Sequence, residues 1–275
     1  MQLRRASSVG EAVEALRGGA KALAGGTELV PLLRDGLVEA DTLVHLAEAV
    51  PRGVRGTAIG AGTTLAELEA DPEIPAALRE ACRLAASPQL RNMGTIGGNL
   101  LQATRCWYWR LAYPCRLHGG ARCHAREGQH REHAILANDF CASAHPSDPA
   151  AALLALGATV RTDRRELPLA DLYRLPDEED RATATLAADE LILELEVPRP
   201  DASTYLKAMD RKRWAFALVG VAAARFADVT RVALAGVAPI PWFLDDGLAT
   251  ATPLPGTAYK VELAEALVRR AVAAL

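Results

Sequence analysis

Four of the five cysteines in this 275-residue chain lie close together, at Cys106, Cys115, Cys123 and Cys141, while Cys82 stands apart. Thiolates are the usual ligands of zinc and of iron–sulfur clusters, so a group of four is a candidate metal centre. No C-x-x-C pair occurs, so the spacing matches neither a zinc knuckle nor the bacterial ferredoxin pattern. The residues alone leave three interpretations open: an iron–sulfur cluster, a zinc ion with mixed ligands, and thiols without a metal.

The stretch around these cysteines is rich in basic and imidazole side chains. Against Glu127 and Glu132 it carries six arginines, which are Arg105, Arg110, Arg116, Arg122, Arg126 and Arg131. We expect this excess of positive charge to favour deprotonation of the cysteines. Five of the six histidines also fall here, at His118, His124, His130, His133 and His145, and they keep zinc open as an alternative.

Two glycine pairs form a second candidate site. They lie in AGGTEL (24–29) and TIGGNL (95–100), each beside a predicted strand. Glycine lets the backbone approach a ligand closely and turn its N–H groups toward an anion. With the Thr27 hydroxyl and the Asn99 amide beside them, two such loops suit a diphosphate. Neither fits G-x-G-x-x-G, and no G-x-x-x-x-G-K-[ST] occurs, so a Rossmann site and a P-loop are not indicated.

Composition excludes several classes of function. The 31 basic and 34 acidic side chains give a formal charge of −3, which does not indicate a nucleic-acid partner. The first residues lack the apolar stretch of a signal peptide, and no run approaches the roughly 18 apolar residues that span a bilayer. We therefore expect a cytoplasmic chain with no membrane span and no disulfides. No H-E-x-x-H motif or serine, histidine and acid set supports hydrolysis.

Short strands and helices must position both candidate sites. The pattern predicts helices over 11–19 and 74–87, strands over 41–46 and 56–62, and a strand, glycine turn and helix over 21–36. Thr64 and Glu67 form a capping-box pattern that opens a further helix. Cys82 lies on the apolar side of the 74–87 helix, where we expect a small core residue.

Periodicity is lost between residues 104 and 145. It returns with a helix that Ser147 caps and Gly157 ends, followed by a strand. Loops of this length inside compact domains are usually functional, so we interpret 104–145 as a functional insertion. A polar connector over 175–190 then precedes the apolar strand LILELEV (191–197), which we expect to open a second lobe of strands and a closing helix.

Five stretches in order carry a family resemblance: KALAGGTELVPLLRDG, GAGTTLAEL, LRNMGTIGGNL, AHPSDPAAALLALGATV and YLKAMDRKRWAFALVGVA. Together they resemble the FAD-binding medium subunit of the molybdenum hydroxylases, the xanthine dehydrogenase and aldehyde oxidoreductase family. The cysteine-bearing insertion resembles the branch that includes 4-hydroxybenzoyl-CoA reductase and certain bacterial aldehyde oxidoreductases. In that branch the flavin subunit also holds a [4Fe-4S] cluster.

The resemblance implies an α+β fold. It consists of a two-lobed FAD-binding domain of the PCMH or vanillyl-alcohol-oxidase type and a smaller α/β C-terminal domain. We expect FAD-binding subdomains over 1–50 and 51–170, the second with the insertion 104–145, and the C-terminal domain over 185–275.

The resemblance also assigns site residues. It implies that the FAD diphosphate is bound by Ala24, Gly25, Gly26, Thr27, Glu28, Leu29, Thr95, Ile96, Gly97, Gly98 and Asn99. Asp148 would reach the adenosine side, and Lys207 would lie near the flavin. Cys106, Cys115, Cys123 and Cys141 map onto the ligands of the [4Fe-4S] cluster, and no catalytic residue is expected.

The implied function is electron transfer in a heterotrimer. Partners would be a molybdopterin-binding large subunit, where an aldehyde, purine or aromatic acyl-CoA reacts, and a small subunit with two [2Fe-2S] clusters. The flavin subunit would exchange electrons with NAD, quinone, ferredoxin or oxygen, and co-export with a partner would allow a periplasmic location. Trp107, Tyr108 and Trp109 would anchor an interface or surround the cluster. Two alternatives remain: a zinc-stabilised module for a phosphorylated ligand, and a stand-alone FAD oxidoreductase of the fold shared with cell-wall UDP-sugar reductases.

Overall fold

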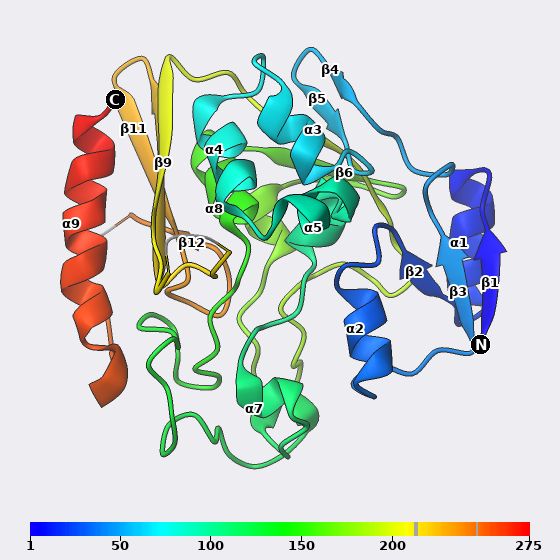
Figure 1. The fold of residues 1–275 in the computed structure, drawn as a ribbon, viewed down its shortest axis with the longest axis horizontal. Helices are drawn as coiled ribbons and strands as arrows, with labels where there is room; N and C mark the ends of the chain where they lie inside the picture. Colours follow the sequence, from blue (N-terminus) through cyan, green and yellow to red (C-terminus); the bar gives the residue numbers. More distant parts are fainter. Residues whose placement is uncertain (212–213, 246) are drawn as a thin grey trace.

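The computed structural model describes residues 1–211, 214–245 and 247–275. Lys212 and Arg213, which belong to the motif over 205–222, and Asp246 lie outside the described residues. The described elements form three sheets with helices between and around them. Figure 1 shows the first sheet at one end of the molecule and the last helix along the opposite end.

The N-terminal elements form a small parallel sheet. Its strands are β1 (Gln2–Arg5), β3 (Thr42–His45) and β2 (Lys21–Leu23), in that spatial order, and its helices are α1 (Val9–Arg17) and α2 (Leu29–Arg34). Ser8 caps α1 by accepting a hydrogen bond from the N–H of Glu11, and Gly18 ends the helix. Parallel strands need crossover connections, which α1 and α2 supply. The loop between β2 and α2 carries the first glycine pair.

The second sheet is antiparallel and has the order β4-β5-β8-β6-β7. The strands are β4 (Val54–Arg55), β5 (Ala58–Gly60), β6 (Thr159–Thr162), β7 (Glu166–Pro168) and β8 (Ile192–Glu196), and η2 (Leu169–Leu172) is a short 3₁₀ helix. The helices of this region are α3 (Leu65–Ala70), α4 (Ala76–Leu84), α5 (Pro88–Met93), α6 (Ile96–Leu100) and α8 (Asp148–Leu156). Both partners of the predicted capping box of α3 form their hydrogen bonds.

Helix α8 forms the centre of the core. Every residue from Asp148 to Leu156 is buried, and the helix packs on α4, on α6 and on strands of the third sheet. As predicted, Ser147 caps it and Gly157, in the left-handed conformation, ends it. Because the helix is apolar on all sides, it can bury surface against several elements at once.

The third sheet has the order β12-β11-β10-β9 and is antiparallel. Its strands are β9 (Ala202–Ala208), β10 (Val219–Phe226), β11 (Val229–Ala235) and β12 (Trp242–Phe243), followed by η3 (Pro255–Thr257) and α9 (Tyr259–Ala273). The stretch 214–226, which the sequence left open between helix and strand, contains strand β10. Helix α9 covers one face of this sheet (Figure 1), with α8 in contact with β10 and β11.

One predicted strand has other partners than we expected. Strand β8, which we expected to open the second lobe, pairs with β5 through Ala58 and Glu196 and with β6 through Thr159 and Glu196. It therefore completes the second sheet instead of beginning the C-terminal lobe. The partner of an apolar strand is decided by non-local pairing, which an acidic connector before the strand does not report.

The insertion over 104–145 is largely irregular, as predicted. It contains only the one-turn helix α7 (Trp107–Arg110) and η1 (Arg116–His118). Ile135 and Leu136 are fully buried in the core of the third sheet, and both donate their N–H groups to the Val237 carbonyl. None of the described helices is both long and apolar enough to cross a membrane.

Candidate cofactor sites

A cavity of about 760 Å³ lies between the first sheet, the α5–α6 region and strand β9. Its volume falls in the range of small-molecule and cofactor sites. All of the residues assigned to the FAD site line it except Ile96, which is fully buried behind the wall. Two glycine loops that are 70 residues apart in sequence are thus brought to one cavity, as the sequence predicted.

The two loops pack directly on each other. A Cβ at Gly25 would overlap the carbonyl of Met93, and a Cβ at Gly97 would lie 2.9 Å from the Cβ of Ala61. At Gly25 only glycine fits, because backbone lies where a side chain would begin, and at Gly97 a side chain would crowd Ala61. Among the described residues, the N–H groups of Gly25, Gly26 and Thr27 make no hydrogen bond to backbone carbonyls. These donors remain for a ligand, and a diphosphate suits them.

Charge on the wall also fits an anion. Arg105 lines the cavity, lies 2.6 Å from a carboxylate oxygen of Glu28, and stacks its guanidinium 5.0 Å from the ring centre of Phe216. In the described part of the chain, Nε of Arg105 is buried and has no hydrogen-bond partner. Burial lowers the pKa of Arg105, although Glu28 acts against it. An orphaned cationic donor beside two glycine loops is what an extended diphosphate ligand requires.

Asp148 and Lys207 also line the cavity, but they bind each other. Lys207 Nζ lies 2.7 Å from one Asp148 oxygen and donates to the Leu84 carbonyl at 2.9 Å, and its side chain is 1% exposed. The Tyr205 hydroxyl donates to the other Asp148 oxygen at 2.5 Å, and burial raises the pKa of Tyr205. The pair joins α8 to β9, and direct contact of either residue with FAD stays a prediction.

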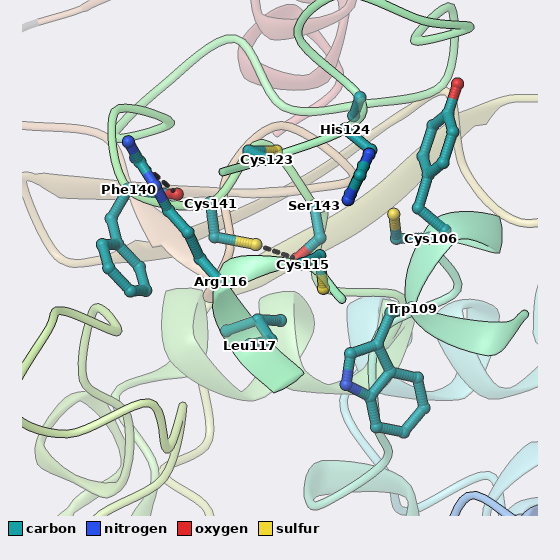
Figure 2. Close-up of a pocket in the computed structure, with 12 residues that line it drawn as sticks. Cys106, Trp109, Cys115, Arg116, Leu117, Cys123, His124, Phe140, Cys141 and Ser143 are labelled. Atoms are coloured by element: carbon teal, nitrogen blue, oxygen red, sulfur yellow. Dashed lines mark hydrogen bonds between the residues drawn. The ribbon is translucent and has the colours of Figure 1, made fainter. Parts of the chain in front are cut away.

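The four clustered cysteines line a second, small cavity inside the insertion. Figure 2 shows Cys106, Cys115, Cys123 and Cys141 around it, each from a different segment of the loop. The N–H groups of Tyr108 and Trp109 act to lower the pKa of Cys106, and the N–H of Ser143 acts to lower that of Cys141, although burial outweighs them. Such donors stabilise thiolate ligands of metal centres. Four thiols around one cavity are the donor set that a multinuclear thiolate-bound cluster would use, and cluster binding stays a prediction.

The expectation that arginines favour deprotonation of the cysteines is wrong for two of them. Burial raises the pKa of Cys106 to about 11 and that of Cys141 to about 12, and no arginine opposes it. The loop arginines bind oxygen atoms instead. Arg116 donates to the Phe140 carbonyl (Figure 2) and Arg126 to the Asn138 carbonyl. The surroundings therefore do not favour the thiolate form of Cys106 and Cys141.

The histidines do not assemble a zinc site. Within the described residues, no three His, Cys, Asp or Glu side chains converge on the position of one metal ion. His118 contacts the Trp109 carbonyl, and His130 contacts the Ala125 carbonyl. Only His124 lines the small cavity, with its Nε2 buried and unpaired among the described residues. His133 Nε2 lies 3.2 Å from the Cys106 sulfur, and burial lowers the pKa of this histidine to about 4, so its ring is neutral.

The aromatic residues beside Cys106 form a shell around the small cavity. Tyr108 and Trp109 line it, and the Tyr108 hydroxyl accepts a hydrogen bond of 2.6 Å from the Gln129 N–H. Trp107 makes an edge contact with His133. Two of the three residues thus surround the cavity, and the interface role of the trio stays a prediction. The predicted core residue Cys82 is fully buried and far from a thiolate state, since burial raises its pKa.

Comparison with known proteins agrees with this geometry. The model of a family described as the FAD-binding domain in molybdopterin dehydrogenase matches residues 1–200. The chain belongs to this family. It is 38% identical over 249 residues to the aldehyde oxidoreductase FAD-binding subunit PaoB of Escherichia coli. The aligned region covers 82% of this chain and 77% of PaoB. It is 39% identical over 105 residues to the carbon monoxide dehydrogenase medium chain of Hydrogenophaga pseudoflava, 34% of this chain and 36% of that one.

Solved structures of the family share the fold. A structure of carbon monoxide dehydrogenase from Hydrogenophaga pseudoflava that lacks the Mo-pyranopterin moiety matches with a TM-score of 0.71, covering 100% of this chain and 96% of that one at 24% identity. The predicted fold class is confirmed: an α+β FAD-binding domain followed by a smaller C-terminal unit. As a member of this family, the chain is an oxidoreductase flavoprotein subunit.

Sequence reasoning missed part of the large cavity. Ser87, Asn92, Arg105, Trp214 and Phe216 line it and were not predicted as site residues. From the sequence, Arg105 was considered only as one of the six arginines around the cysteines. Its position between the second glycine loop and the first cysteine was the available signal.

Proposed function

We propose that this chain is the electron-transfer subunit of a heterotrimeric molybdenum hydroxylase and that it holds both FAD and a [4Fe-4S] cluster. FAD binding follows from the family. The observation that carries the finer proposal is the small cavity lined by all four cysteines of the insertion, in the same chain as the flavin cavity. Residues 101–105 line the flavin cavity or adjoin its wall and lead directly to Cys106, so the two sites are neighbours along the chain.

When bound, the two groups supply two-electron and one-electron chemistry, respectively. The protein would hold them at fixed positions and shield two of the four sulfurs from water. Cys115 and Cys141 are each 7% exposed, and Cys106 receives N–H donors from α7. His133 can donate Nε2–H to the Cys106 sulfur once that sulfur is a thiolate, because its other nitrogen is unpaired among the described residues. These contacts tune a cluster through hydrogen bonding and burial.

The partners follow from the relatives. PaoB is named as an FAD-binding subunit and the carbon monoxide dehydrogenase chain as a medium chain, so both work inside larger enzymes. We propose the same for this chain, with a molybdopterin-binding subunit that oxidises an aldehyde and a [2Fe-2S] subunit that delivers the electrons. The higher overall similarity to PaoB favours an aldehyde over a purine or an aromatic acyl-CoA. The cytoplasm remains our expectation for its location.

Iron, sulfide and flavin assays on anaerobically purified protein test the proposal. We expect about one FAD and about four irons per chain. Cys115→Ser should lose iron and keep FAD, because Cys115 lines only the small cavity. Cys82→Ala is the matched control, since Cys82 is buried in α4 away from both cavities, and it should keep both cofactors.

Other outcomes decide among the alternatives. One zinc per chain without iron would identify the zinc-stabilised form, which the absence of a three-ligand group among the described residues disfavours. FAD without any metal, in a chain that is active alone, would identify a stand-alone flavin oxidoreductase. Either result would contradict the two-cofactor proposal.

A further inference from the structure

One carboxylate joins the wall of the flavin cavity to the cysteine insertion. Glu28 follows the first glycine pair and stands directly before α2, but its side chain does not cap that helix. Its Oε1 accepts a hydrogen bond of 3.0 Å from the Ala103 N–H and one of 2.5 Å from Arg110. Its Oε2 forms the 2.6 Å ion pair with Arg105. All three partners flank Cys106 in sequence, about 80 residues from Glu28.

Arg110 completes the connection on the insertion side. It lies at the end of α7, which begins directly after Cys106, and its Nε donates to the Thr104 carbonyl at 2.8 Å. Thr104 in turn accepts a hydrogen bond of 3.1 Å from the Cys106 N–H through its hydroxyl. The side chains of Glu28 and Arg110 are each only 18% exposed, so solvent screens this pair weakly.

The order of one site therefore depends on the order of the other. An insertion whose cysteines are held at fixed positions places Arg105 and Arg110 against Glu28. Glu28 then fixes the backbone of the loop whose Gly25, Gly26 and Thr27 donors line the flavin cavity. Conversely, an ordered glycine loop presents Glu28 to the insertion. Two sites that bias the same element are coupled, and the coupling is reciprocal.

We propose that Glu28 and Arg110 are positioning residues that couple the two cofactor sites, so that FAD binds more tightly when the cysteine site is loaded. This inference rests on the proposed function, because it requires both cofactors. It adds that neither site reaches full affinity alone and that Arg110, which lines neither cavity, transmits the effect. We expect a coupling of about tenfold in the Kd of FAD, a typical size for linked sites.

The test measures the Kd of FAD by equilibrium dialysis on the full-length chain, before and after anaerobic reconstitution with iron and sulfide. In the wild type we expect reconstitution to tighten binding about tenfold. In Arg110→Gln the ratio should fall below about twofold, because Glu28 then loses its ion pair with α7 and keeps only its contacts with Ala103 and Arg105. Glu28→Gln serves as a second variant if Arg110→Gln does not fold, and it should give the same reduced ratio.

Glu69→Gln is the matched control. Glu69 forms a partly buried ion pair of 2.8 Å with Arg91 in the same half of the protein, but the pair does not contact the insertion. This variant should keep the tenfold ratio. A wild-type ratio near one, or a full ratio in Arg110→Gln, would overturn the coupling while leaving both cofactors in place. A wild type that takes up no iron would instead contradict the proposed function, and the coupling with it.

Discussion

The two cofactor cavities are built by opposite means. The flavin cavity is walled by short loops between regular elements, and its shape follows from backbone that packs on backbone at Gly25 and Gly97. The cysteine cavity lies in a stretch of about 40 residues with only α7 and η1 as regular structure. Its walls are held by side chains that reach carbonyl oxygens, such as Arg116 and Arg126. The first cavity is a product of the fold, whereas we expect the second to depend on a bound ligand for its stability.

Because the two cavities are built differently, substitutions in the two regions should affect the stability of the protein differently. Removing a contact from the framework should lower the stability of the whole protein, because α8 and the sheets share one core. Emptying the cysteine site should loosen only the insertion, since Ile135 and Leu136 still anchor its end in the other core. The four predictions below test this contrast, in order of expected effect.

The largest effect should come from the buried ion pair that joins α8 to β9. Lys207→Met leaves the Asp148 carboxylate in a site where it is 2% exposed, with the Tyr205 hydroxyl as its one remaining side-chain donor among the described residues. Breaking a buried pair on one side typically costs about 3 kcal/mol or more. Urea unfolding of the FAD-free protein should show this loss, whereas Lys21→Met, at an exposed position in β2, should change stability by less than about 0.5 kcal/mol. An equal, small effect of both variants would contradict a structural role for the pair.

The second effect concerns the contact between the two glycine loops. Gly25→Ala places a methyl group on the Met93 carbonyl, so the loops must separate. We expect FAD affinity to fall about a hundredfold, which equals about 3 kcal/mol, while iron content stays unchanged. Gly10→Ala in α1 is the control, because a Cβ there meets nothing closer than 4.0 Å, and it should keep full affinity. Dialysis against FAD measures both, and an unaffected Gly25→Ala would show that the loops do not bind the diphosphate.

The third prediction concerns the order of the insertion with and without bound metal. Chelation of the metal should expose the loop arginines, and trypsin should then cut within 104–145 about tenfold faster. Sites in α1 to α5 should be cut at an unchanged rate. Mass spectrometry of the first fragments locates the cuts. Equal rates with and without metal would mean that the insertion is ordered by its protein contacts alone.

This contrast also explains which features the sequence could predict. Local signals succeeded: the capping box at Thr64, the ends of α8 and the buried Cys82 each depend on residues within one or two turns. The glycine pairs and the clustered cysteines indicated the two candidate sites in the sequence, because few other residue types fit at such positions. Contacts between residues far apart in sequence were either predicted wrongly or not predicted at all. Strand β8 pairs with β5 and β6, and Glu28 accepts a hydrogen bond from Arg110, which lies 82 positions further along the chain.

The smallest effect, counted per pH unit, is a pH dependence at the junction of α9 and the insertion. Lys260 is fully buried and donates to the carbonyls of Glu132 and Gly236, and burial lowers its pKa from 10.5 to about 7. Between these values the unfolded chain holds one more proton, so stability should rise with pH and be lost as pH falls from about 10 toward 7.

The slope from this group should be at most about 1.4 kcal/mol per pH unit. Urea unfolding at pH 7, 8 and 9 measures it, and Lys260→Met should flatten the curve while the exposed Lys21→Met should not. An unchanged slope in Lys260→Met would show that the lysine keeps its proton in the folded protein.

Whether one chain holds two redox groups can be decided by a reductive titration. The purified full-length protein, with FAD bound and iron reconstituted, is titrated anaerobically with a low-potential photochemical reductant while flavin and cluster absorbance are followed. The wild type should accept about three electrons per chain, two at the flavin and one at the cluster, and Cys115→Ser about two. Uptake of about two electrons by both proteins would contradict the account, because the cysteine insertion would then hold no redox centre.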